Sequence, residues 1–377
     1  MYSKSLLPKI TEYFPKRKKS CLRNVLLLVQ CMLLKETVNL NRLKGCMNTV
    51  LGKENEPSSN YKRLIRIFDN YSRTNLWLEL LRFGFQVLRL KTEYLIIDGT
   101  KWKRGEKWYH YQVLSLVYQG VAIPIYWENI NKNGISSVEE RIKLFDKAFK
   151  YFNLEGKTLL ADREYIGSDW FKYLKEKNLS FTIRIKKNTY VDAINQAAGK
   201  SYQEMIKKVL RSKLPDKAVG KIIELDGIKL HFVVIKNPKK DPKDPVIFLF
   251  STHIDKSAKA VGLSYLGRYK IEHCFKHLKS NGFCLEQLNL RTMTRSRLLF
   301  AITVFAYVLS INEGLKDYKK VKLNACKKKP EKRVSVFRKG IDKLVAFCGN
   351  LRSFYQYLVD VFIAKLPTYL NSFTINV

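Results

Sequence analysis

The sequence predicts an α/β protein in which a mixed sheet is flanked by helices. Short, continuous apolar runs at residues 93–98, at residues 158–162 and directly after Pro245 are typical of buried strands. Amphipathic helical patterns alternate with these runs in the middle of the chain, as in sheets covered by helices. A β-rich insertion interrupts this alternation, and the N- and C-terminal regions both show helical patterns.

Residues 1–90 form the predicted helical N-terminal region. Two short amphipathic patterns there are separated by a Gly/Pro/Ser break, with Ser58 or Ser59 as the expected N-cap of the second helix. That helix could lie in a DNA groove as part of a helix-turn-helix, but two such helices are also common in bundles, and both interpretations remain open. The cations exposed on it would be Lys62, Arg63 and Arg66.

Residues 91–187 form the first part of the predicted core, with β-rich segments first and strands alternating with helices afterwards. Ser136 or Ser137 is the expected cap of the first of these helices. Asp98 and Asp162 each end an apolar strand, the position at which α/β sheets present side chains to ligands. Each aspartate could equally be a strand terminator or a helix cap.

Residues 188–245 form the predicted β-rich insertion, in which Asp226-Gly227 between two alternating apolar runs indicates a hairpin. The second part of the core, residues 246–313, carries the helix with Glu272. It also holds the apolar stretch Leu298–Ile311, which is too short to span a bilayer and predicts a buried helix rather than a membrane segment. Residues 314–377 form a basic helical region that could mediate dimerisation.

The charge of the chain indicates a polyanionic partner. There are 70 Lys and Arg against 33 Asp and Glu, a formal net charge of +37. A genomic bias toward lysine would raise glutamate too, so nucleic acid is the expected partner. The 7 cysteines are scattered and never form a C-x-x-C pair, which favours reduced thiols in a cytoplasm over disulfides or a zinc finger. We see no secretion signal at the N-terminus.

Glu272 lies in a basic helix whose residues separate by angle. At about 100° per residue, Tyr265, Arg268, Glu272 and Lys279 fall within roughly 60° of one another and would form one polar stripe. Leu263 and four other apolar residues would face the sheet. A solvated face with an Arg268–Glu272 pair is the plain alternative, but it leaves the tyrosine and the second cation unexplained.

Asp98, Asp162 and Glu272 would suit a polyanionic substrate if they converge. Two divalent ions about 4 Å apart can activate a water or hydroxyl and stabilise the leaving oxygen of a phosphoryl transfer. Mg²⁺ prefers oxygen ligands and retains some of its water, so two Asp and one Glu are sufficient protein ligands.

These motifs resemble those of bacterial insertion-sequence transposases of the DDE class, which have a retroviral-integrase-like, RNase H-like core. The sequence is most similar to the group with a Tyr-Arg-Glu-Lys signature, spaced Y-x2-R-x3-E-x6-K. Tyr265, Arg268, Glu272 and Lys279 match it in full. Asp98 begins a D-G-T motif, and Asp162 lies in A-D-R-E-Y, in the order that the family shows.

The resemblance implies cut-and-paste transposition of an insertion sequence. Asp98, Asp162 and Glu272 would be the catalytic residues and bind two Mg²⁺ or Mn²⁺ per active site. Hydrolysis at the transposon ends would free a 3′ hydroxyl that attacks target DNA, while Tyr265, Arg268 and Lys279 hold phosphates. The partners would be double-stranded terminal inverted repeats and target DNA, bound by a homodimer at the nucleoid of a bacterial cytoplasm.

Related enzymes pass through a hairpinned DNA end and stack a flipped base on a Trp of the insertion. The insertion here contains no Trp, so Tyr190 or Tyr202 would have to supply the stacking ring. Further candidate DNA contacts, each equally explained as solvated charge, are Lys101, Lys103, Arg104, Arg163, Lys186, Lys187 and Arg291. An inactive DNA-binding protein on a transposase scaffold and an RNase H-like nuclease without strand transfer remain as alternatives.

Overall fold

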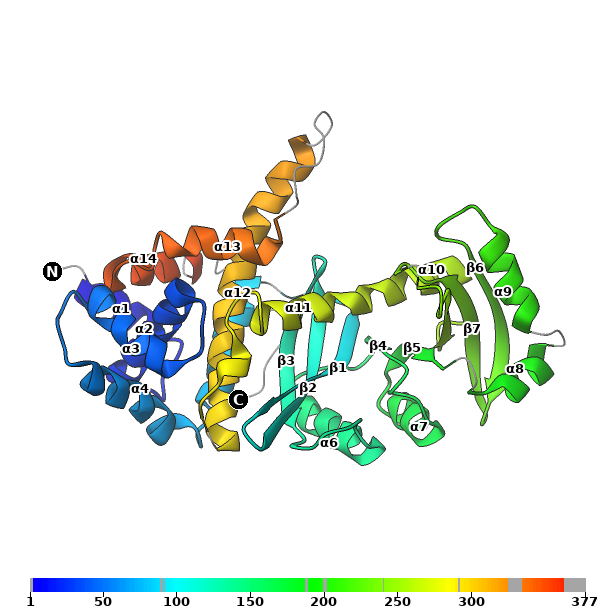
Figure 1. The fold of residues 1–377 in the computed structure, drawn as a ribbon, viewed down its shortest axis with the longest axis horizontal. Helices are drawn as coiled ribbons and strands as arrows, with labels where there is room; N and C mark the ends of the chain where they lie inside the picture. Colours follow the sequence, from blue (N-terminus) through cyan, green and yellow to red (C-terminus); the bar gives the residue numbers. More distant parts are fainter. Residues whose placement is uncertain are drawn as a thin grey trace. The chain divides into compact units, whose positions relative to one another are not determined.

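The computed structural model divides the chain into two compact units, each described by itself (Figure 1). The core unit comprises Thr92–Cys274, and the helical unit combines the two ends of the chain, Met1–Lys91 and Phe275–Val377. The residues that the structure describes are 3–88, 90, 92–186, 189–198, 202–239, 241–290, 292–324 and 334–362.

The core unit is built on an eight-stranded sheet, counted over the described residues, with the order β3-β2-β1-β4-β5-β8-β7-β6. The strands are β1 (Tyr94–Arg104), β2 (Lys107–Tyr118), β3 (Val121–Asn129), β4 (Thr158–Ala161), β5 (Ser180–Ile185), β6 (Ala218–Leu225), β7 (Ile228–Lys236) and β8 (Val246–Ser251).

The pairing in this sheet confirms the predicted α/β class with a mixed sheet. Strands β1, β4 and β5 are parallel neighbours, and β2 and β3 extend β1 in antiparallel fashion. This is the RNase H-like arrangement. The insertion extends the same sheet, because β7 pairs with β8 and β8 pairs with β5. The predicted Asp226-Gly227 hairpin is confirmed, with φ values of 51° and 75° at its two turn residues.

Helices cover both faces of the core sheet (Figure 1). Phe171 of α7 stacks on Phe181 of β5, and Tyr202 of α9 packs against Phe248 of β8, so α7 and α9 share one face. The opposite face carries α10, the 3-10 turn η1 and α11. The helical elements are α6 (Val138–Phe149), α7 (Ser168–Glu176), α8 (Val191–Ala198), α9 (Tyr202–Arg211), α10 (Ala258–Tyr265), η1 (Leu266–Tyr269) and α11 (Lys270–Leu278), and α11 runs across the unit boundary.

The helical unit is organised around the long helix α12, which packs against α2, α5 and α13. By length and composition its segment Met293–Lys316 could cross a membrane, but the segment is buried within the protein, as predicted for a core helix. The elements are α1 (Ser3–Thr11), α2 (Lys19–Lys35), α3 (Leu40–Leu51), α4 (Pro57–Tyr71), α5 (Leu76–Leu88), η2 (Leu285–Gln287), α12 (Met293–Asn324), α13 (Val336–Val345) and α14 (Leu351–Phe362).

Local capping follows the sequence in one helix and departs from it in another. Ser137 and Glu140 form the capping box of α6, as expected. The prediction of Ser58 or Ser59 as the N-cap of α4 is wrong, since Glu56 is the N-cap and Pro57 is the first helical residue. Proline is favoured at that position because its fixed φ suits a helix and its missing N–H would have had no helical partner.

Candidate active site

Asp98 and Asp162 occupy adjacent positions on neighbouring parallel strands. Ile97 of β1 is in register with Ala161 of β4, and each aspartate is the next residue along its chain. Residues in register project to the same face of a sheet. Asp162 directly follows β4, but Asp98 does not end its strand as expected, because β1 continues along β2 to Arg104. Asp98 therefore marks the end of the parallel pairing only.

The segment that carries Glu272 is not one regular helix. Between α10 and α11 the chain forms η1, and about three residues per turn there break the 100° periodicity. The predicted polar stripe is consequently wrong at its first member. Tyr265 is fully buried in an apolar cluster with Ile235, Leu249 and Val261. Leu263, predicted to pack on the sheet, is 52% exposed.

The guanidinium of Arg268 contacts all three predicted catalytic acids. Its Nη1 lies 3.2 Å from Asp98 Oδ2, and its Nη2 lies 2.8 Å from Glu272 Oε1 and 3.8 Å from Asp162 Oδ2. The arginine is only 3% exposed. Three acids from β1, the end of β4 and α11 thus meet at one buried positive charge, and we call this group the acid centre.

Burial and charge shift the pKa values of the acid centre. Burial raises the pKa of Asp98 to about 7 against the opposing effects of Arg268 and the Gly99 N–H, and Asp162 and Glu164 raise it further. Burial also lowers the pKa of Arg268, but Tyr265 and the three acids outweigh it and leave that pKa above its ordinary value. Arg268 therefore keeps its charge while Asp98 binds a proton readily.

Comparison with known families decides the identity of this core. The family model described as Transposase DDE domain matches residues 89–309, more than half of the chain. The chain belongs to this family. No curated protein shows a significant match to the sequence. A cryo-EM structure of the piggyBac transposase synaptic complex with hairpin DNA is similar to the chain with a TM-score of 0.46 and 14% identity, over 94% of this chain and 77% of that one. This likeness is too distant to indicate what the chain binds.

The DDE family generally uses divalent metal ions, so the acid centre can be tested for fit. Its donors are carboxylate oxygens, the ligands that Mg²⁺ and Mn²⁺ prefer, and they converge on a point that already holds a cation. In the described part of the chain no three such side chains lie close enough together to hold a metal ion as they stand. The donor set fits the metals, provided that Arg268 gives up its place among the acids.

Two cations around the acid centre were missed by the sequence reasoning. Arg184 of β5 contacts Asp244 closely and lies 4.0 Å from Asp162, while Lys239 lies 3.2 Å from Glu272. Arg184 had a signal, since an arginine in the apolar strand SFTIRI is unusual unless it is paired. Lys239 lies in a polar connection that the sequence could not place beside Glu272.

The remaining signature residues have different surroundings. Burial raises the pKa of the Tyr265 phenol, and the hydroxyl is buried with no hydrogen-bond partner among the described residues. A phosphate contact by Tyr265 is therefore wrong for this conformation. Lys279 belongs to the helical unit, where its Nζ lies 2.8 Å from Glu286.

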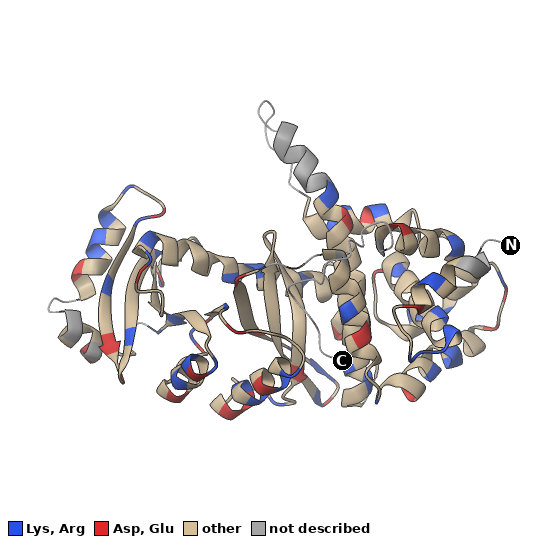
Figure 2. Ribbon diagram, turned by 180° about the vertical axis from the view of Figure 1, so that it is seen from behind, with Lys and Arg blue, Asp and Glu red and all other residues tan. Residues whose placement is uncertain are grey.

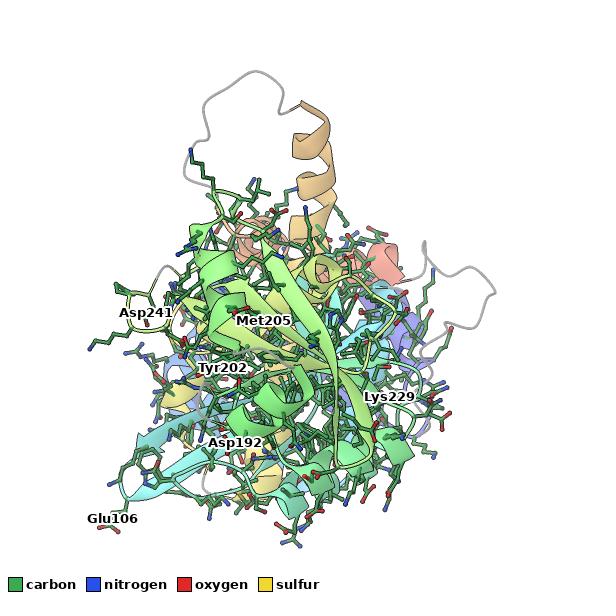
Figure 3. The ribbon with its side chains drawn as sticks, turned by 90° about the vertical axis from the view of Figure 1, so that its right-hand side faces the viewer. Glu106, Asp192, Tyr202, Met205, Lys229 and Asp241 are labelled. Atoms are coloured by element: carbon green, nitrogen blue, oxygen red, sulfur yellow. The ribbon has the colours of Figure 1, made fainter. Side chains whose placement is uncertain are left out.

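The other predicted DNA contacts fall into three groups. Lys101, Lys103 and Arg104 are exposed toward the tip of the β1–β2 hairpin, where Glu106 stands clear of the sheet (Figure 3). Arg163 and Lys186 line a hollow of about 340 Å³ together with Arg184, which was not among the predicted contacts and connects the hollow to Asp162. Lys187 and Arg291 lie outside the described residues.

The two tyrosines predicted to stack on a base are packed on the core sheet. Tyr190 packs against Phe250 with the ring centroids 5.3 Å apart. Tyr202, on α9, is buried against Phe248 of β8 (Figure 3). Tyr202 is therefore not available as a stacking platform.

Proposed function

We propose that the protein is a transposase that cuts DNA at the ends of an insertion sequence and joins the freed 3′ hydroxyl to target DNA. The observation that supports this most is the convergence of Asp98, Asp162 and Glu272, from three separate elements, on Arg268. Carboxylates gathered in this way suit phosphoryl transfer, and the Tyr-Arg-Glu-Lys spacing supports the proposal that the chain is an insertion-sequence member of the DDE family.

The three acids would hold two Mg²⁺ or Mn²⁺ ions. Bound there, the ions would polarise the phosphoryl oxygens and lower the pKa of the attacking water or hydroxyl. Asp98 must first lose the proton that its raised pKa favours. Arg268, displaced from the carboxylates, would provide a charge-assisted hydrogen bond to a nearby phosphate oxygen.

Double-stranded DNA is the proposed substrate, and the charge of the protein supports it. Lys and Arg are spread over helices and strands of both units (Figure 2), and the net charge of +37 attracts a polyanion at long range. Pairing of two transposon ends calls for two copies of the active site, so we propose a homodimer at the nucleoid of a bacterial cytoplasm.

A cleavage assay tests this function. The substrate is a plasmid that carries the DNA flanking the coding sequence, incubated with Mg²⁺ or Mn²⁺. We expect wild-type protein to cut and join it, Asp98→Asn and Glu272→Gln to be inactive, and Glu155→Gln, an exposed acid of the same unit, to retain activity. Cutting by Asp98→Asn would refute the proposal.

The same assay separates the two alternatives. Wild-type protein that binds the plasmid without cutting it is an inactive DNA-binding protein. Wild-type protein that cuts but never joins pre-cut ends to a target is a nuclease without strand transfer.

A further inference from the structure

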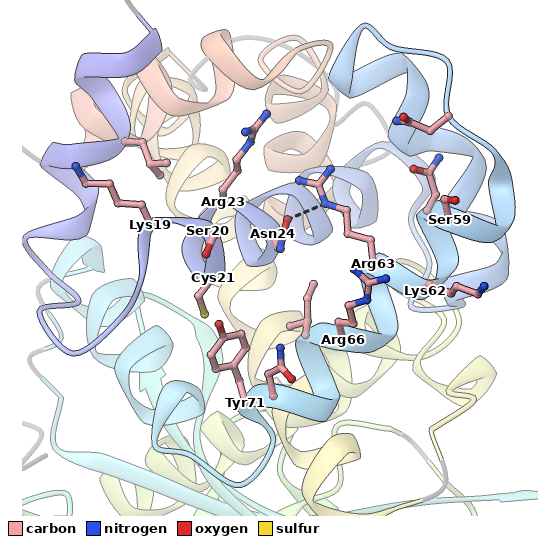
Figure 4. Close-up of a pocket in the computed structure, with 15 residues that line it drawn as sticks. Lys19, Ser20, Cys21, Arg23, Asn24, Ser59, Lys62, Arg63, Arg66 and Tyr71 are labelled. Carbon is pink, nitrogen blue, oxygen red and sulfur yellow. Dashed lines mark hydrogen bonds between the residues drawn. The ribbon is translucent and has the colours of Figure 1, made fainter.

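A large basic hollow lies in the helical unit and shares no lining residue with the acid centre. It has a volume of about 780 Å³, and most of its lining comes from α2, α4 and the residues just before α4 (Figure 4). We call it the α2–α4 hollow. Ligand-binding pockets commonly have volumes of about 300–1,000 Å³, so the hollow is large enough to bind a ligand.

The lining of the α2–α4 hollow is strongly one-sided in charge. None of its 15 lining residues is acidic. The five cations among them are Lys19, Arg23, Lys62, Arg63 and Arg66. Since like charges held together repel one another, such a cluster is expected where a polyanion will neutralise it.

The side chain of Arg63 is held in the hollow by a hydrogen bond between the two helices. Arg63 reaches from α4 to Asn24 of α2, and its Nε donates a 2.8 Å hydrogen bond to Asn24 Oδ1 (Figure 4). Burial, followed by the charge of Arg23, lowers the pKa of this guanidinium. The two helices therefore hold cations near one another without a compensating acid in the lining.

The concave form changes what α4 can do. A recognition helix reads base edges when it stands clear of its unit and enters the major groove. Here Arg63 is half-buried and bonded to α2, so α4 presents its cations to a hollow that α2 also lines. The lining is mostly polar, whereas a pocket selective for a nucleobase needs apolar walls. A chain of phosphates satisfies both features.

We propose that the α2–α4 hollow binds the sugar-phosphate backbone of a DNA strand and anchors DNA without reading its sequence. The site adds Lys19, Arg23 and Asn24 of α2 to the three cations predicted on α4, and it replaces base reading by backbone contact. This proposal rests on the proposed function, in which DNA is the substrate.

Binding without catalysis tests the site. Fluorescence anisotropy in EDTA would measure the affinity for two duplexes of equal length and unrelated sequence, between about 50 and 200 mM salt. The variant is Arg23→Gln with Arg66→Gln, both exposed side chains. The matched control is Lys35→Gln with Arg82→Gln, which removes two exposed cations of the same unit outside the hollow. Thermal melts would show that both variants fold.

We expect the hollow variant to weaken binding of both duplexes by roughly 10- to 100-fold, and to lower the salt slope by about 1.8, or 0.9 for each lost phosphate contact. The control variant should change either quantity much less. Equal losses of DNA affinity in the two variants would show that only the net charge of the protein matters, and would overturn the proposal. If the hollow variant lost affinity for only one of the two duplexes, α4 would read base sequence after all, and the proposal would be wrong.

A second outcome would also overturn the proposal: the hollow variant loses binding of free ATP, measured in the same way, but binds both duplexes as tightly as wild-type protein. Because these measurements need no metal, they remain informative if the cleavage assay fails. A protein that binds DNA through the hollow but never cuts would leave this site standing and refute the proposed reaction alone.

Discussion

The acid centre and the α2–α4 hollow treat charge in opposite ways. In the acid centre, three carboxylates surround one buried guanidinium, and Arg184 and Lys239 add positive charge at its edge. In the hollow, five cations line one space with no acid among the described lining residues. The first group is internally neutralised, whereas the second depends on an external anion.

This difference predicts how each region responds to its ligand. A divalent ion entering the acid centre must replace Arg268, so binding there is an exchange of cations. DNA entering the hollow meets no internal competitor and relieves repulsion. Metal affinity and DNA affinity should therefore respond in opposite directions to the removal of arginines.

The largest expected effect is from Arg268→Ala. Removal of a buried charge leaves its partners uncompensated, so the free energy of unfolding should fall by about 3–5 kcal/mol without metal. Chemical denaturation would measure it. Arg163→Ala, an exposed arginine one residue from Asp162, is the control and should change stability by less than about 0.5 kcal/mol.

The same variant should bind Mn²⁺ more tightly. Without DNA, calorimetry should show Mn²⁺ affinity raised by about 10-fold or more, since 1.4 kcal/mol of lost competition is sufficient, and Mn²⁺ should recover part of the lost stability. Unchanged or weaker Mn²⁺ binding would show that Arg268 supports the metal site instead of competing for it.

The next effect concerns pH and Asp98. Burial raises the pKa of Asp98 from 3.8 to about 7, so the metal-free folded protein retains a proton that the unfolded chain has released. This stabilisation is complete below pH 3.8 and is lost as the pH rises through about 7. Relative to Asp98→Asn, wild-type protein should lose on the order of 2–4 kcal/mol across this window. A constant difference between the two proteins would contradict the shift.

A smaller, opposite effect is expected in the hollow. Arg66→Gln relieves repulsion among cations, so it should raise the free energy of unfolding by about 0.5 kcal/mol at low salt, and added salt should erase the gain. The matched control is Arg82→Gln. Destabilisation by Arg66→Gln would mean that this arginine is compensated after all.

The smallest effect should come from Lys239→Gln. Its 3.2 Å pair with Glu272 joins side chains that are 57% and 40% exposed. Exposed pairs contribute about 0–1 kcal/mol, so thermal melting should show little change. A large loss of thermal stability would show that Lys239, rather than Arg268, supplies most of the positive charge that neutralises the acids.

The sequence predicted what depends on short segments. Apolar runs predicted the strands that carry Asp98 and Asp162, and the Asp226-Gly227 pair predicted a hairpin, but that the two strands are neighbours came only from the structure. Contacts between distant segments were not accessible in this way. Arg184 and Lys239 approach the acids only through pairing and loop placement, and Tyr265 is buried because η1 shifts the phase of a helix that the periodicity treats as continuous.

The sheet order has a consequence for synthesis of the chain. Arg268 and Asp98, which meet in the acid centre, are 170 residues apart in sequence. Strand β8 pairs with β7, so the insertion must be made before the last core strand has both neighbours. A chain that ends before α11 lacks Glu272, so the acid centre gains its third carboxylate only after the whole insertion has been made.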